Sequence, residues 1–195
     1  MGIGIILLIV AGVVVFYFVS VYNGLQTLQT QIAASIQEIG NQLKRQASLI
    51  PNLESSVRGY MSHEKGIFDM LTTARSSATK AANSGSVSDI DKAISDIQSA
   101  MPKISIAIED NPEIKADSTV NNFMTELGDT ADKLMYSRRS LIDLTQSYNQ
   151  KLLMFPSSLI ASMFGFKAEK GLATATTGAH VEVSDAETQD VKVNL

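Results

Sequence analysis

The chain has 195 residues with 16 basic and 20 acidic side chains, so it has room for one domain plus an anchor and gives no basic surface for nucleic acid. Cysteine is absent, which excludes disulfides, thiolate metal sites and thiol nucleophiles. Because there are also only two histidines, few ways remain to build a catalytic centre, and we expect neither an enzyme nor a bound cofactor or metal ion.

Residues 1–22 predict a retained membrane anchor. Between Gly2 and Val21 nothing is charged and only Tyr17 and Ser20 are polar, and a helix of this length rises roughly 30 Å, which matches the hydrocarbon core of a bilayer. A cleaved signal peptide is disfavoured because no basic residue precedes the apolar run. A buried core helix is the other alternative, but the run is long for one. The lipid bilayer is therefore an expected partner.

The orientation of this anchor is only weakly encoded. Lys44 and Arg45 are the first basic residues after the apolar run, and they lie beyond the window in which such charges are most decisive. Since the short uncharged N-terminus is easily translocated, we favour an N-terminus outside the cell and a cytoplasmic bulk.

Beyond the anchor, apolar residues recur at spacings of three, four or about seven, which predicts amphipathic helices. The first stripe extends from Leu25 to Ile50 with no strong breaker behind the anchor, so we expect the span to continue into a long helix. Pro51 should kink that helix or replace it by a turn, because proline lacks a backbone donor. The second stripe begins at Leu53 and ends in a turn at 83–86.

The third stripe extends from Ile90 to Ile108. Ser88 and Asp89 provide a good helix start, because their side chains can accept the unpaired amides of the first turn. Pro102 falls within the stripe, and we expect a kink there.

The last stripe is the longest and extends from Phe123 to Phe155, where Pro156 interrupts it. Residues 110–112 form a turn signal before it, and Asp117 is expected to cap the helix. Four long stripes joined by short turns describe an all-α fold, an antiparallel bundle of about four long helices that continues from the anchor.

The C-terminal part is divided into two segments. Residues 157–166 are apolar or small, and they either cover one end of the bundle, which we prefer, or lie against the bilayer. Residues 167–195 lose the helical period, so the bundle domain is expected to cover 23–166 and to be followed by a mobile tail or interaction arm. Two pieces of the tail have strand character and could add to the sheet edge of another subunit: Val181 with Val183, and Val191 with Val193.

The candidate motifs for chemistry are incomplete. His63 and Glu64 resemble the start of a zinc-binding helix, but Ile67 stands where the second histidine is needed. The carboxylates of Glu109, Asp110 and Glu113 lack the ligand spacing of a calcium loop. A glycine-rich phosphate loop is also absent from the sequence.

The chain as a whole resembles the LemA family of small bacterial membrane proteins. The most specific string is Leu-Ile-Pro-Asn-Leu at residues 49–53, followed by Tyr-x-x-His-Glu, and Gln46 departs from the family pattern, in which a second arginine is common at this position. The site residues that carry the resemblance, with a structural role expected for each, are Tyr22, Asn23, Lys44, Arg45, Pro51, Asn52, Leu53, Tyr60, His63, Glu64, Arg75, Tyr148, Asn149, Phe155 and Pro156.

The resemblance implies an antiparallel bundle in the cytoplasm, no recognised catalytic activity and a poorly defined biochemical role. Some members of the family are linked to membrane invagination in magnetosome formation. Our first hypothesis is a scaffold in the bacterial cell membrane, a homo-oligomer that organises or shapes the bilayer. The alternative is an adaptor or signalling module that recruits a client, such as a membrane protease. A hydrolase is the least favoured interpretation.

Overall fold

The computed structural model describes residues 2–60 and 65–172, and every element in this part of the chain is an α-helix. In order, the helices are α1 (Gly2–Val57), α2 (Lys65–Ser84), α3 (Val87–Glu109), α4 (Pro112–Ala116), α5 (Ser118–Leu153) and α6 (Ser157–Met163). The predicted all-α fold with a long apolar helix at its N-terminus is confirmed. The two tail pieces with strand character lie outside the described residues.

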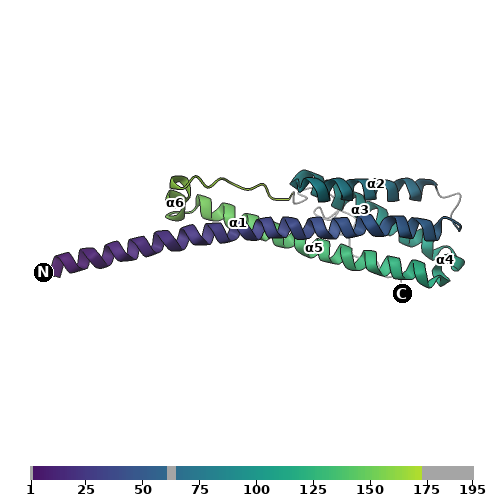
Figure 1. The fold of residues 1–195 in the computed structure, drawn as a ribbon, viewed down its shortest axis with the longest axis horizontal. Helices are drawn as coiled ribbons and strands as arrows, with labels where there is room; N and C mark the ends of the chain where they lie inside the picture. Colours follow the sequence, from purple (N-terminus) through teal and green to yellow (C-terminus); the bar gives the residue numbers. More distant parts are fainter. Residues whose placement is uncertain (1, 61–64, 173–195) are drawn as a thin grey trace, which may run out of the picture.

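Helix α1 is uninterrupted over 56 residues and joins the apolar segment to the first amphipathic stripe (Figure 1). Its apolar part is exposed on all sides, and by length and composition it can cross a membrane. The buried stripe begins at Leu25. This geometry is compatible with the predicted membrane anchor and confirms that the apolar segment continues into a long helix.

Pro51 does not end α1, so the alternative of a turn at this residue is wrong. Ile50, Leu53 and Val57 are all buried around the proline. Burial of each large aliphatic side chain contributes about 1.5–3 kcal/mol, which offsets the cost of roughly 3 kcal/mol for a proline in a helix interior. The predicted start of the second helix at Leu53 is wrong for the same reason, since Leu53 belongs to α1 and α2 begins at Lys65.

Helix α3 begins slightly earlier than the predicted start at Ser88 and continues through Pro102 without ending. Asp89 lies in its first turn, where the carboxylate accepts hydrogen bonds from Lys80 Nζ at 2.7 Å and Ser84 Oγ at 2.8 Å. The hydrogen bond from Lys80, followed by that from Ser84, holds the pKa of Asp89 below its usual value. These contacts join the end of α2 to the start of α3.

The predicted turn at 110–112 contains the start of a short helix, α4, which the apolar stripes did not predict. The Asn111 side chain caps it by accepting from the backbone amides of Glu113 and Ile114. The predicted cap of the last helix is confirmed, because Asp117 Oδ1 accepts from the amide of Thr119 at 2.8 Å.

Helix α5 packs against the amphipathic part of α1. The Ser35 hydroxyl donates to the carbonyl oxygen of Ser137 at 3.3 Å, and the Arg45 guanidinium lies 3.4 Å from the Glu126 carboxylate. Residue numbers rise along α1 as they fall along α5, so the two helices are antiparallel.

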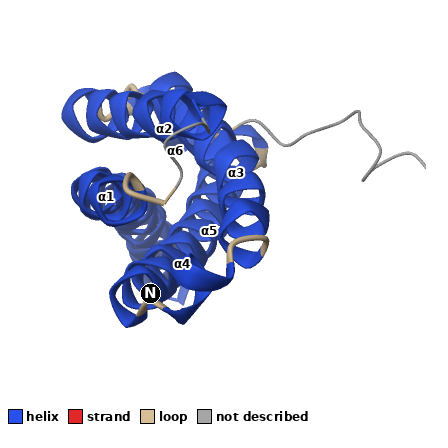
Figure 2. Ribbon diagram, turned by 90° about the vertical axis from the view of Figure 1, so that its right-hand side faces the viewer, coloured by secondary structure: helices blue, strands red, loops and turns tan. Residues whose placement is uncertain are grey.

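Helices α2 and α3 complete the arrangement, which Figure 2 shows in end view. Gly85, with φ of +59°, forms the tight turn between them, a conformation that favours glycine. The Ser77 hydroxyl then donates to the Asp96 carboxylate across the two helices. Helix α3 meets α5 through an ion pair between Arg138 and Asp91 at 3.8 Å. The four long helices therefore surround one core.

The core of the α1–α5 pair repeats every seven residues. A face with this repeat stays turned toward its neighbour along the whole length of a slightly wound helix pair. The buried positions are Leu25, Ile32, Ile39, Gln46 and Leu53 on α1, and Val120, Leu127, Leu134, Leu141 and Tyr148 on α5.

Candidate membrane-proximal site

The most distinctive site lies where α6 returns to α1, at the end of the bundle from which the apolar segment emerges (Figure 1). After α5 ends, the chain reverses at Pro156 and forms α6. Ile160 and Ala161 on one face of α6 are buried. Their burial holds α6 against the bundle, beside the last part of the apolar segment.

An aromatic cluster fixes the end of α6 to α1. The Tyr22 ring lies 4.9 Å from the Phe164 ring and 5.7 Å from the Phe166 ring, measured between ring centroids. Gly165 stands between the two phenylalanines with φ of +72°, and the amide of Phe166 donates to the carbonyl of Ala161 at 3.0 Å. This is a helix C-terminal motif that requires a left-handed residue, for which glycine is favoured. It brings both phenylalanines against Tyr22.

Residues 167–172 form a strap that runs along α5. The Tyr148 hydroxyl donates to the carbonyl of Lys167 at 3.1 Å. The Asn149 side chain makes two hydrogen bonds with the backbone of Glu169. Its Nδ2 donates to the Glu169 carbonyl at 2.9 Å, and its Oδ1 accepts from the Glu169 amide at 3.0 Å. Leu172 is buried. The strap is therefore packed, and the mobile tail that we expected from residue 167 does not begin there; residues 173–195 lie outside the described part.

The strap changes the electrostatics of Tyr148. Burial raises the pKa of its hydroxyl above the usual value of 10.0, and the nearby negative charge of Glu169 adds to this effect. The tyrosine is thus held in its neutral form, which can donate to the strap.

The outer face of α6 and the turn before it are apolar and exposed. A hollow between α6 and α1 is lined only by apolar surface, with Val13, Val14, Tyr17 and Phe18 on the α1 side and Pro156, Leu159 and Ile160 on the other. One face of residues 157–166 thus packs on the bundle, as in the preferred placement, and the other face remains uncovered, while contact with the bilayer stays a prediction. The large exposed side chains are Leu153, Met154, Phe155, Leu159, Met163 and Phe164.

The structure divides the residues that carry the family resemblance between the two ends of the bundle. The end of the bundle from which the apolar segment emerges holds Tyr22, Asn23, Tyr148, Asn149, Phe155 and Pro156, whereas the opposite end of α1 lies near Pro51, Asn52, Leu53 and Tyr60. Lys44, Arg45 and Arg75 are exposed along the helices between them, and His63 and Glu64 lie outside the described residues.

The sequence did not predict that Phe164, Glu169 or Leu172 take part in this site. The only signal for the aromatic contact was a glycine between two phenylalanines. The contacts of Glu169 and Leu172 carry no periodic signal, because the strap is not helical.

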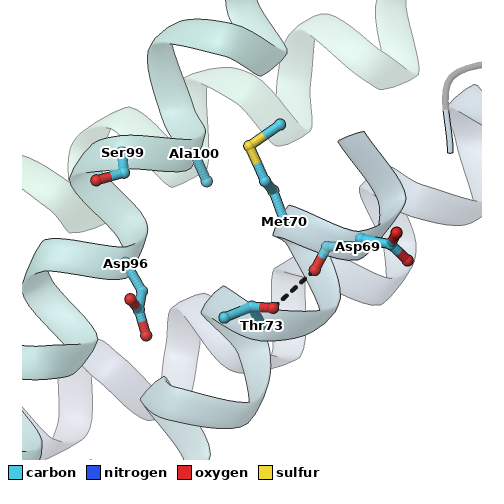
Figure 3. A pocket seen from close by; sticks show the side chains of 6 residues that line it. All are labelled: Asp69, Met70, Thr73, Asp96, Ser99 and Ala100. Carbon is cyan, nitrogen blue, oxygen red and sulfur yellow. Dashed lines mark hydrogen bonds between the residues drawn. The ribbon is translucent and has the colours of Figure 1, made fainter. Parts of the chain in front are cut away.

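A second hollow lies between α2 and α3 (Figure 3). The Thr73 hydroxyl donates to the carbonyl of Asp69 at 2.8 Å, and the carboxylates of Asp69 and Asp96 lie on opposite sides of the hollow and do not converge. Met70 and Ala100 supply apolar walls. Within residues 2–60 and 65–172, no group of three or more His, Asp or Glu side chains is placed to hold a metal ion.

Comparison with known proteins complements this geometry. A search of curated proteins gives no match to the chain. The family model described as LemA family matches residues 35–186, which is most of the chain, and the chain therefore belongs to the LemA family.

Proposed function

We propose that this protein is a membrane-anchored scaffold whose copies associate and organise or shape the membrane that holds them. The observation that carries the proposal is the continuity of α1, which passes from the apolar segment into the bundle without a break. In this proposal the protein resides in a bacterial cell membrane with the bundle on the cytoplasmic side.

The contacts around the exit of the apolar segment support a rigid connection. Leu25 is fully buried only three residues after Tyr22, and Tyr22 itself packs on Phe164 and Phe166. Helix α1 is therefore held by tertiary contacts as soon as it leaves the apolar segment. Association between bundles would then set the tilt of the spans, and tilted spans in a closed ring impose a shape on the bilayer.

The test is to break this connection without unfolding the bundle. A short Gly-Ser linker inserted between Asn23 and Gly24 should uncouple the span from the bundle. The matched control places the same linker between Gly85 and Ser86, where the chain already turns. We expect the first insertion to abolish vesicle deformation in electron micrographs and the control to preserve it. The scaffold proposal fails if the unaltered protein is monomeric by light scattering at all concentrations and leaves vesicles unchanged.

One feature favours the second candidate function, an adaptor that recruits a client membrane protein such as a protease. The Tyr136 side chain is 78% exposed on α5, beside a hollow whose walls include Arg139, Asp143 and Leu144. Tyrosine and arginine are enriched among the residues that contribute most to the binding energy of protein interfaces.

A binding assay with a purified client separates the two functions. Tyr136→Ala and deletion of residues 173–195 would each be compared with Tyr60→Ala, which removes an exposed tyrosine just after the C-terminal end of α1. If Tyr136→Ala or the deletion loses client binding while self-association is unchanged, the adaptor is favoured. Loss of self-association with no saturable client binding favours the scaffold.

A further inference from the structure

We infer that residues 152–166, here called the inserted wedge, lie among the acyl chains of the phospholipid leaflet next to the bundle. The wedge contains the end of α5, the turn at Pro156, α6 and the aromatic residues that follow it. The inference rests on the membrane anchorage in the proposed function, and it assigns a lipid-binding surface to a second, separate part of the chain.

The sequence of the wedge suits this environment. No residue between Lys151 and Lys167 is charged. The segment is too short to span a bilayer and has the length of a re-entrant or interfacial element. Among the described residues its two most exposed large apolar side chains are also the most exposed of the molecule, with Leu153 83% and Phe155 79% exposed.

The position of the wedge along α1 determines its depth. Leu159 and Ile160 line the hollow together with Val13 and Val14. Val13 lies nine residues before Tyr22, which corresponds to roughly 13 Å along a helix axis, nearly half of a hydrocarbon core of about 30 Å. If the apolar segment of α1 spans the bilayer, the side chains packed beside Val13 must lie in the same layer.

Two of the three serine hydroxyl groups of the wedge have partners in the chain itself, which lowers the cost of placing them in lipid. The Ser157 hydroxyl lies within hydrogen-bonding distance of two carbonyl oxygens, at 2.6 Å from that of Lys151 and 2.8 Å from that of Met154. The Ser162 hydroxyl donates to the carbonyl of Leu159 at 3.0 Å. The sharp reversal between α5 and α6 therefore does not depend on water to satisfy these hydroxyl groups.

Basic residues mark the expected level of the lipid headgroups. Lys151 Nζ lies beside Gly24, 3.5 Å from the position that a Cβ would occupy there, and Gly24 follows the end of the apolar segment. Lys167 and Lys170 belong to the strap just beyond the wedge, and Glu169 is the one acidic residue of the strap. Long lysine side chains at the edge of an apolar segment reach the headgroup phosphates. The surface as a whole fits a leaflet that contains anionic phospholipid.

Insertion of the wedge has a mechanical consequence. In the proposed function α1 crosses both leaflets, whereas α6 lies beside α1 only at the end of the apolar segment next to the bundle (Figure 1). It therefore adds volume to one leaflet alone, as interfacial helices do. A scaffold with this shape would expand the leaflet that faces the bundle.

The absence of native tryptophan makes the inference directly testable. Single tryptophans are introduced into the full chain as Leu159→Trp on the wedge, Val10→Trp in the apolar segment and Tyr136→Trp on the exposed face of α5. Each variant is reconstituted into vesicles of phosphatidylcholine and phosphatidylglycerol with brominated acyl chains, which quench tryptophan fluorescence on contact. We expect strong quenching of the Leu159→Trp and Val10→Trp variants and little of the Tyr136→Trp variant.

The other outcomes overturn the inference in distinguishable ways. If only the Val10→Trp variant is quenched, the protein is anchored but the wedge lies outside the lipid. If the Leu159→Trp variant escapes both brominated lipid and aqueous acrylamide, a second copy of the chain covers the surface instead. If the Val10→Trp variant is not quenched either, the anchorage in the proposed function also fails. Met163→Trp, at another exposed position of α6, provides a second probe should Leu159→Trp disturb folding.

Discussion

At the scale of single residues, the Gln46 side chain stands out in the core. It is only 1% exposed, and neither of its side-chain polar atoms has a hydrogen-bond partner among the described residues. An unsatisfied buried polar group costs about 1–3 kcal/mol. Gln46→Leu should therefore raise the free energy of unfolding by about that amount, measured by denaturant unfolding in detergent. Gln37→Leu, at an exposed position of α1, serves as the control. A destabilised Gln46→Leu variant would show that the glutamine is paired in the folded protein.

Asn149 is the residue on which the strap depends most. Asn149→Ala removes both hydrogen bonds to Glu169. Since each such bond contributes about 0.5–1.5 kcal/mol, the amide of Glu169 should exchange its hydrogen about tenfold faster or more. Hydrogen–deuterium exchange measures this, with Asn122→Ala, an exposed asparagine on the same helix, as the control. Unchanged exchange at Glu169 would mean that Asn149 does not hold the strap.

Tyr148 gives the strap a dependence on pH. Because burial raises the pKa of the hydroxyl in the folded protein, folding favours the neutral form. Its contribution to stability is fully present below the unfolded value of 10.0 and is lost as the pH rises through the raised folded value. Denaturant midpoints measured across this alkaline range should fall more steeply for the unaltered protein than for Tyr148→Phe. Tyr136→Phe, at an exposed tyrosine, should leave the slope unchanged, and equal slopes for all three proteins would contradict the account.

At the scale of elements, the pairing of α1 with α5 dominates the bundle. Leu141 is fully buried on α5, whereas Leu153 at the end of the same helix is 83% exposed. Leu141→Ala should lower the free energy of unfolding by about 2–5 kcal/mol, as is usual for large-to-small changes in a core. Leu153→Ala should leave it nearly unchanged in detergent. Comparable losses for the two variants would place the core elsewhere.

How far the sequence predicted these elements depends on the kind of signal. The stripes starting at Leu25 and Phe123 predicted α1 and α5, because both helices repeat one buried face over many turns. Pro51 was misleading because a local rule about proline ignores the buried neighbours that keep the helix intact. Helix α4 was missed because five residues are too few to show a period.

The candidate site was less predictable than the helices. Tyr22 and Asn149 were identified through the family resemblance, but their partners Phe164 and Glu169 were not. The approach of Phe164 to Tyr22 depends on the left-handed backbone at Gly165 and on how α6 packs, and the spacing of residues encodes neither. The contact of Tyr22 joins segments far apart in the sequence, and the contact of Asn149 reaches a strap that has no helical period.

At the scale of the whole molecule, the central physical property is the rigid connection between the apolar segment and the bundle. Helix α1 supplies the axis, and the contacts of Tyr22 and α6 hold it where the apolar segment ends. In the proposed scaffold this rigidity lets the association of bundles set the tilt of the membrane-spanning segments. The inserted wedge would add a one-sided contact with the leaflet at the same place.

The most direct test is a distance measured across the junction in lipid. The chain has no native cysteine, so Ala11→Cys and Gln31→Cys can carry two spin labels at exposed positions of α1, one on each side of Tyr22. In lipid nanodiscs, double electron–electron resonance should give one narrow distribution centred at about 30 Å, the length of twenty residues of unbroken helix. A broad distribution, or a clearly shorter mean distance, would show a hinge between the span and the bundle and would contradict the account.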